Sequence, residues 1–147
     1  MKKIIGILLG AVVLLGVFGC TKKEVQTQTV GHSVKVSVEN QITTADIWII
    51  PDTEANRGTS VWGTATVAEL GAKQTQTAFV EKSENGDTYL IRIIDENQMY
   101  YSADGVVLHE NASIVLKEGT EPMSAVVEVY GADGTPEAEY SMFVASL

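Results

Sequence analysis

VKVSVE, residues 34–39, decides the fold class of this 147-residue chain. Valines alternate with polar residues without interruption, so in an extended strand the three valines point to one face and the polar side chains to the other. Such a strand is half-buried. The stretch therefore predicts a sheet that covers an apolar core on one side.

Eight further segments are short, rich in Val, Ile, Thr and Tyr, and bounded by turn residues such as Asn85-Gly86, Asp104-Gly105 and Asp133-Gly134. They are residues 45–50, 75–81, 88–95, 99–102, 106–109, 113–117, 125–130 and 139–145. Eight or nine strands at this spacing predict an all-β domain. An antiparallel β-sandwich is expected, with a small β-barrel as the alternative.

The amino terminus has a different pattern. A basic start is followed by an unbroken run of apolar residues and glycines at 4–18, which is typical of a secretory signal peptide. A membrane-spanning helix needs about 17 residues at least, so the run is just short of that and a signal anchor is the alternative. We divide the chain into a signal peptide (1–19), a polar, flexible tether (20–33) and a β domain (34–147).

Val17-Phe18-Gly19-Cys20 resembles the lipobox of bacterial lipoproteins. The resemblance implies that signal peptidase II cuts between Gly19 and Cys20, and that Cys20, the only cysteine, carries the lipid. Phe18 departs from the small residue usual at its position, whereas Val17 is tolerated. Covalent lipid makes a membrane the expected partner, since two or three acyl chains anchor stably. A buried or free Cys at the end of a signal anchor is the alternative.

Four motifs carry a second resemblance. They are Glu39-Asn40, Ile47 to Pro51, Leu70-Gly71 before Lys73, and Tyr89 to Tyr100. The segment from Val34 to about Leu108, roughly half of the chain, is similar to a family of small extracytoplasmic β-sandwich domains found in bacterial lipoproteins and secreted proteins. The resemblance implies the fold and an exported location. It implies no activity. Thr21, a residue other than Asp directly after the expected lipidated Cys20, is similar to the pattern that goes with outer-membrane sorting in bacterial lipoproteins, so the outer membrane is expected if the cell has two membranes.

Charge argues against nucleic acid as a partner. From Cys20 onward the chain has 8 basic and 19 acidic residues. Binding to phosphate backbones depends on clustered Lys and Arg, which this chain lacks.

The chain shows no recognisable catalytic or cofactor motif. His32 lies in the expected tether, and His109 has no nucleophile signature beside it, so it is expected at the surface near a strand end. Two histidines 77 positions apart and no second cysteine predict no transition-metal site. Paired carboxylates leave a small hydrolase as a less favoured alternative. Asp95-Glu96-Asn97 is expected to form a hairpin turn.

The loop at residues 51–63 is the candidate binding loop. Arg57 and Trp62 are residue types enriched in binding hot spots, although Trp62 packing onto the domain is the alternative. Asp46, Asp52 and Glu54 offer oxygen ligands for Ca²⁺, but a solvated acidic edge is favoured. The sequence thus predicts a lipid-anchored, non-catalytic β domain that binds a protein or glycan. A periplasmic inhibitor or assembly factor is the alternative.

Overall fold

The computed structural model describes residues 33–60 and 62–144. Nine strands and one helical turn make up this part of the chain. They are β1 (Ser33–Asn40), β2 (Ala45–Pro51), α2 (Glu54–Arg57), β3 (Val67–Leu70), β4 (Gln74–Glu81), β5 (Thr88–Asp95), β6 (Tyr100–Val107), β7 (Ala112–Glu118), β8 (Ser124–Tyr130) and β9 (Pro136–Val144). The expected signal peptide, Cys20 and the expected tether up to residue 32 lie outside the described residues.

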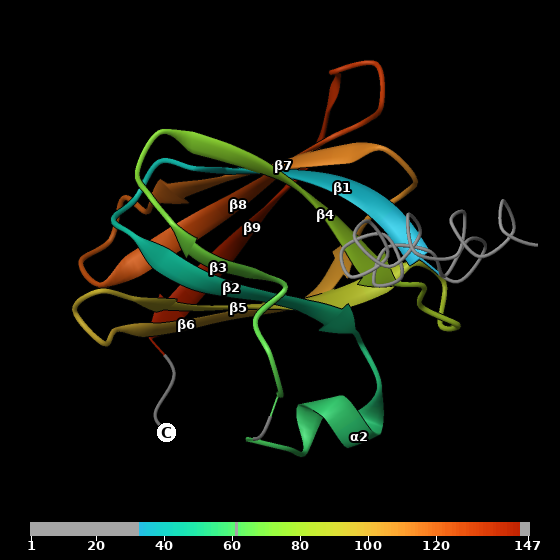
Figure 1. Cartoon of the computed structure of the whole chain (residues 1–147), viewed down its shortest axis with the longest axis horizontal. Helices are drawn as coiled ribbons and strands as arrows, with labels where there is room; N and C mark the ends of the chain where they lie inside the picture. Colours follow the sequence, from blue (N-terminus) through green and yellow to red (C-terminus); the bar gives the residue numbers. More distant parts are fainter. Residues whose placement is uncertain (1–32, 61, 145–147) are drawn as a thin grey trace, which may run out of the picture. The chain divides into compact units, whose positions relative to one another are not determined.

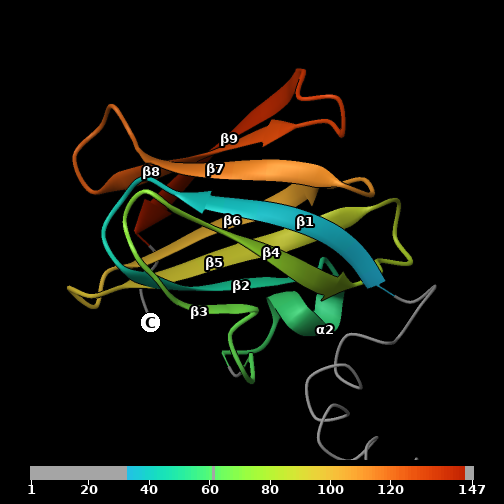
Figure 2. The same ribbon diagram turned by 45° about the horizontal axis from the view of Figure 1, so that its top comes forward.

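All nine strands belong to one sheet in the order β3-β2-β5-β6-β9-β8-β7-β1-β4. Figure 2 shows one wall formed by β4, β1, β7 and β8 and a facing wall formed by β3, β2, β5 and β6. The two end strands, β3 and β4, come into contact, so the sheet is nearly closed and barrel-like. The all-β prediction is confirmed, and the small barrel is the architecture found.

One strand pair makes the sheet mixed. β1 pairs antiparallel with β4 on one side and parallel with β7 on the other. The other strand pairs are antiparallel. The chain reaches this arrangement because β1 and β2 lie in opposite walls, with β1 inserted between β4 and β7 (Figure 1).

The core lies between the two walls. Val34, Val36 and Val38 are at most 5% exposed, as the alternation in residues 34–39 predicts. Inward side chains of β2, β5, β7 and β8 complete the same cluster. Each fully buried aliphatic side chain contributes about 1.5–3 kcal/mol to folding, so apolar packing is the main source of the domain's stability.

β6 is one strand where the sequence predicts two, at 99–102 and 106–109. The Asp104-Gly105 signal between them marks a β-bulge in the pairing with β5, not a turn. Gly105 has a φ of 66°, a conformation that favours glycine. The Gly105 amide donates a hydrogen bond to Asp52 Oδ2 (2.9 Å), so the bulge holds the loop that follows β2.

β3 and α2 are absent from the strand and helix predictions. β3 has only four residues, Val-Ala-Glu-Leu, and pairs with β2 through an irregular register. Its Glu69 has a φ of 50° and donates its amide hydrogen to Asp46 Oδ1 (2.8 Å). α2 is a single turn capped by Thr53, whose hydroxyl accepts from the Asn56 amide. Neither element is long enough to display a periodic pattern.

Asn40 links the two ends of the sheet. Its side chain is fully buried, and Nδ2 donates hydrogen bonds to the carbonyl oxygens of Thr43 (2.8 Å) and Leu70 (2.7 Å). Oδ1 accepts from the Ile42 amide (3.0 Å), and the Asn40 carbonyl accepts from the Lys73 amide (2.6 Å). One asparagine therefore ties the end of β1 to the end of β3 and the start of β4.

Candidate functional site

The candidate binding loop begins with an ion pair of which only the carboxylate is buried. Asp52 is 7% exposed, and its carboxylate accepts two hydrogen bonds from the exposed Arg57, from Nε (2.5 Å) and from Nη2 (2.7 Å). The hydrogen bond from Arg57 is the main reason that the pKa of Asp52 is lowered; the Gly105 amide lowers the pKa further, whereas burial opposes it. Arg57 therefore already has a partner within the domain.

Trp62 packs onto the outer face of the sheet. Its ring stacks on Tyr100 of β6 with centroids 5.0 Å apart and meets Trp48 of β2 edge-on at 5.6 Å. The Arg92 guanidinium of β5 lies 4.6 Å from the Trp62 ring centroid, and Trp62 Nε1 donates to the Thr59 carbonyl (2.9 Å). Such stacking and cation–π contacts each stabilise by about 0.5–1.5 kcal/mol. These contacts are the ones expected if Trp62 packs onto its own domain, which is the alternative to a binding role.

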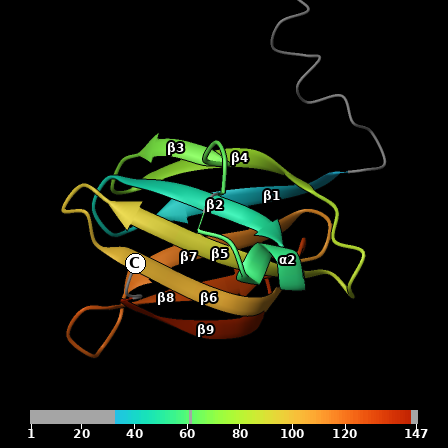
Figure 3. The same ribbon diagram turned by 90° about the horizontal axis from the view of Figure 1, so that it is seen from below.

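The loop itself covers one side of the barrel. α2 lies next to the carboxyl end of β2 (Figures 1 and 3), and the segment after it returns across the outer face to reach β3. The side chains beneath it, Arg92 and Tyr100, are buried although they point away from the core. Sequence reasoning missed both, because alternation alone assigns them to a solvated face.

The three acidic residues around β2 do not form one site. Asp46 and Asp52 lie at opposite ends of the strand, about 20 Å apart at the usual rise per residue. Asp46 Oδ1 accepts from the Glu69 amide, and Asp52 pairs with Arg57. The interpretation of this region as a solvated edge is wrong for Asp52, which is buried.

His109 is exposed just after β6, and its Nδ1 lies 3.3 Å from Asp87 Oδ2. The prediction of a surface histidine near a strand end is confirmed. Across residues 33–60 and 62–144, no group of three His, Cys, Asp or Glu side chains is arranged to hold a metal ion.

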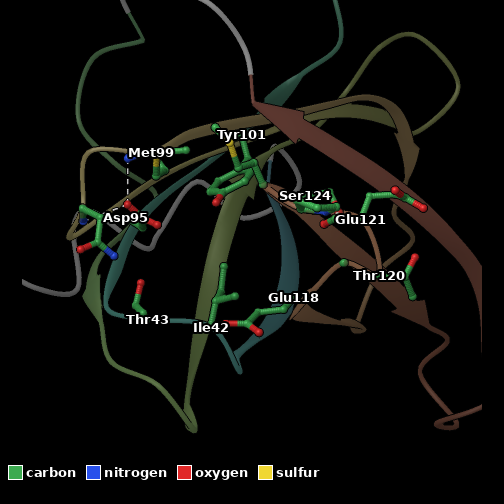
Figure 4. Close-up of a pocket in the computed structure, with 13 residues that line it drawn as sticks. Ile42, Thr43, Asp95, Met99, Tyr101, Glu118, Thr120, Glu121 and Ser124 are labelled. Atoms are coloured by element: carbon green, nitrogen blue, oxygen red, sulfur yellow. Dashed lines mark hydrogen bonds between the residues drawn. The ribbon is translucent and has the colours of Figure 1, made fainter.

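A pocket of about 550 Å³ opens at one end of the barrel. We call it the barrel-end pocket. It is lined by the β1–β2 connection (42–43), the β5–β6 hairpin (95–99), Tyr101, and the β7–β8 connection (118–124). In Figure 4, Asp95 and Glu121 lie on opposite sides of this space, and Tyr101 lies between them. Segments far apart in the sequence thus meet around one concavity.

The pocket is negatively charged. Asp95, Glu118 and Glu121 line it, and none of its described lining residues is Lys, Arg or His. Burial raises the pKa of the Tyr101 hydroxyl, and the charges of Asp95 and Glu118 raise it further. The charges of both carboxylates therefore act on the Tyr101 phenol.

Asp95 also has a structural task. Its Oδ1 accepts hydrogen bonds from the Asn97 (2.9 Å) and Met99 (2.8 Å) amides, the second of which is drawn in Figure 4. This is the side-chain pattern of a turn, so the hairpin prediction for Asp95-Glu96-Asn97 is confirmed. The pocket itself was not predicted. Its traces in the sequence are the turn signals Asp95-Glu96-Asn97 and Glu118-Gly119, which do not show which loops will meet.

No protein-family model, curated protein or solved structure matches the chain. In the part of the chain that the structure describes, no helix has the length and apolar character needed to cross a bilayer. Lipidation at Cys20 and the resemblance to extracytoplasmic domains therefore stay predictions.

Proposed function

We propose that this chain is a lipid-anchored protein of a bacterial cell envelope, and that its β-barrel domain is a binding module without catalytic activity. The observation that carries the binding role is the barrel-end pocket, where three connections meet around a concave, acidic space. Loops held by a rigid scaffold are the usual location of binding residues.

The expected anchor rests on Cys20, which follows the apolar run directly. Twelve residues separate Cys20 from Ser33, where β1 begins. At full extension they would span about 40 Å, enough to hold a small domain beyond the lipid headgroups. The acidic composition supports covalent lipid over charge as the means of attachment, because anionic membrane surfaces attract basic segments.

Protease treatment of intact cells, followed by mass spectrometry of the retained amino-terminal peptide, tests this proposal. Trypsin cleaves after Lys22 and Lys23, so the expected product is a short diacylated peptide that begins at Cys20. Cys20→Ser should abolish the modification, and Thr21→Ser is the matched control that should keep it.

The outcomes separate the alternatives. Release of the domain from intact cells places it on the cell surface. Protection until the envelope is opened favours the periplasmic inhibitor or assembly factor. An unmodified peptide that still contains residues 4–18 would refute the lipid anchor.

A further inference from the structure

We propose that Asn85 is a modification site, at which the folded protein loses ammonia without the help of an enzyme. The backbone nitrogen of Gly86 attacks the side-chain carbonyl carbon of Asn85, and a succinimide ring forms. Water then opens the ring to aspartate or isoaspartate. This inference goes beyond the binding role proposed above and does not depend on it.

The reaction consumes only water. A bond forms between the Gly86 nitrogen and Asn85 Cγ, and the bond between Cγ and Nδ2 breaks. The side-chain nitrogen leaves as ammonia with the proton that the Gly86 amide gives up. Hydrolysis of either ring carbonyl then completes the conversion of an amide to a carboxylic acid. Because the attacking group and its target belong to neighbouring residues, the first step is intramolecular.

The surroundings of Asn85-Gly86 leave room for the attack. It is the only Asn-Gly pair in the chain, and both residues are exposed in the connection between β4 and β5. A Cβ added at Gly86 would meet nothing within 4 Å, so no neighbouring group crowds this backbone position. Glycine also tolerates the backbone rotation that ring closure requires.

The structure distinguishes this pair by the backbone amide that follows each asparagine. The Gly86 N–H donates no hydrogen bond to any described residue. The amides that follow the other four asparagines all donate to carbonyl oxygens: they belong to Gln41 (2.8 Å), Arg57 (2.9 Å), Gln98 (2.9 Å) and Ala112 (3.1 Å). A hydrogen-bonded amide gives up its proton only after local opening. The nucleophile is therefore available at Gly86 alone among these positions.

The Asn85 side chain is held weakly. Its Nδ2 donates one hydrogen bond, of 3.4 Å, to the carbonyl oxygen of Asp52, and Oδ1 accepts none among the described residues. Most N–H···O bonds are about 2.7–3.2 Å long, so this contact restrains the side chain little. The side-chain carbonyl can therefore turn toward the Gly86 nitrogen.

The product would act on the candidate binding loop. Asp52 lies at the start of that loop, and its carbonyl oxygen would face a carboxylate in place of a donor. Isoaspartate also lengthens the backbone of a turn in which Gly86 and Asp87 both have positive φ, the type I′ pattern. Both products thus weaken the contact between this turn and the loop.

Ageing of the purified full chain tests the inference. The protein is held in zwitterionic detergent and mildly alkaline water enriched in heavy oxygen, and is then digested with trypsin in ordinary water. Peptide 83–92 contains Asn85, whereas peptide 93–117 contains Asn97 and Asn111. We expect heavy oxygen in peptide 83–92, as separable aspartate and isoaspartate products, and none in peptide 93–117. Gly86→Ala should suppress the labelling, because the added Cβ hinders the attack.

Ala112→Gly is the matched control. It places a glycine after the exposed Asn111, but the amide at position 112 keeps its hydrogen bond to the His109 carbonyl (3.1 Å). The folded variant should therefore label Asn85 and spare Asn111. In urea, where both amides are free, both asparagines should be labelled.

Three results would overturn the inference. Labelling of Asn85 only in urea would mean that the fold protects it. Equal labelling of Asn85 and Asn111 in the folded Ala112→Gly variant would mean that the backbone hydrogen bond has no role. A single aspartate product would exclude the succinimide.

The effect on the loop has its own measurement. Arg57 lies in the loop with 55% of its side chain exposed, so brief trypsin treatment of the folded chain reports on loop opening. Asn85→Asp should be cleaved after Arg57 faster than Asn97→Asp, which makes the same charge change in another exposed turn. Equal rates would overturn the effect on the loop and leave the modification itself to be judged by the labelling.

Discussion

Replacing Asn40 by alanine tests whether this residue holds the sheet in its nearly closed form. Its side chain makes three hydrogen bonds of 2.7–3.0 Å, and the side chain is fully buried. A hydrogen bond contributes about 1 kcal/mol net, and more when its partner is left buried and unsatisfied. Asn40→Ala should therefore lower the free energy of unfolding by about 3–4 kcal/mol, a large fraction of the 5–15 kcal/mol typical of a domain.

Asn40→Asp is a sharper version of the same experiment. One carboxylate oxygen can still accept from the Ile42 amide, but the other faces the carbonyl oxygens of Thr43 and Leu70. Burial without a cation raises the pKa of the introduced carboxyl, so the folded state binds more protons than the unfolded state. The variant should lose stability as pH rises above the unfolded value of about 3.9, and should approach the stability of Asn40→Ala only at higher pH.

Equilibrium urea denaturation, followed by the fluorescence of Trp48 and Trp62, measures both effects. Asn97→Ala is the matched control, because Asn97 is exposed and its side chain makes no hydrogen bond within the described residues. The control should change stability by less than about 0.5 kcal/mol. A loss below about 1 kcal/mol for Asn40→Ala, or a pH-independent Asn40→Asp, would refute the role assigned to this side chain.

Three further predictions concern the loop after β2 and are measured by the same urea denaturation. Because the pKa of Asp52 is lowered in the folded state, its ionised carboxylate adds stability above about pH 4, and this stability is lost as pH falls through the folded pKa. The difference in unfolding free energy between Asp52→Asn and the unchanged protein should therefore shrink toward about pH 2. A difference that does not change with pH would contradict the ion pair. Trp62→Ala should lower the free energy of unfolding by about 3 kcal/mol, because stacking on Tyr100 and burial of the ring are lost together. An unchanged urea midpoint would mean that the loop does not pack onto the sheet in solution. Gly105→Ala should cost about 1 kcal/mol from backbone strain alone, since an added Cβ has nothing within 4 Å; a neutral result would mean that the bulge relaxes.

Much of the fold follows from local pattern. The alternation in residues 34–39 predicts β1, and residues 88–95 give the bounds of β5 as the structure has them. The parallel pairing of β1 with β7 has no local signature, because strand partners depend on closure of the whole sheet. The same holds for Asp104-Gly105, since an Asp-Gly pair suits both a turn and a bulge.

The candidate site was less predictable. The residue types of Arg57 and Trp62 mark them as candidates for binding. Residue type does not show that Asp52 lies beside Arg57. Nor does it show that Tyr100 and Arg92 lie under Trp62. These partners come from other strands, so only the sheet order brings them together. The barrel-end pocket depends on the same long-range order.

The direction of β1 determines how the domain would bear load. β1 begins at Ser33, the end nearest the expected lipid anchor, and runs for eight residues, about 26 Å, toward the connection that lines the barrel-end pocket. A pull between a membrane and a ligand held in that pocket would act along the strand axis. β4 and β7 flank β1 on both sides, so their hydrogen bonds would be sheared together instead of unzipped one after another. The strand that follows the expected anchor in the sequence is thus hydrogen-bonded on both sides along the direction of such a pull.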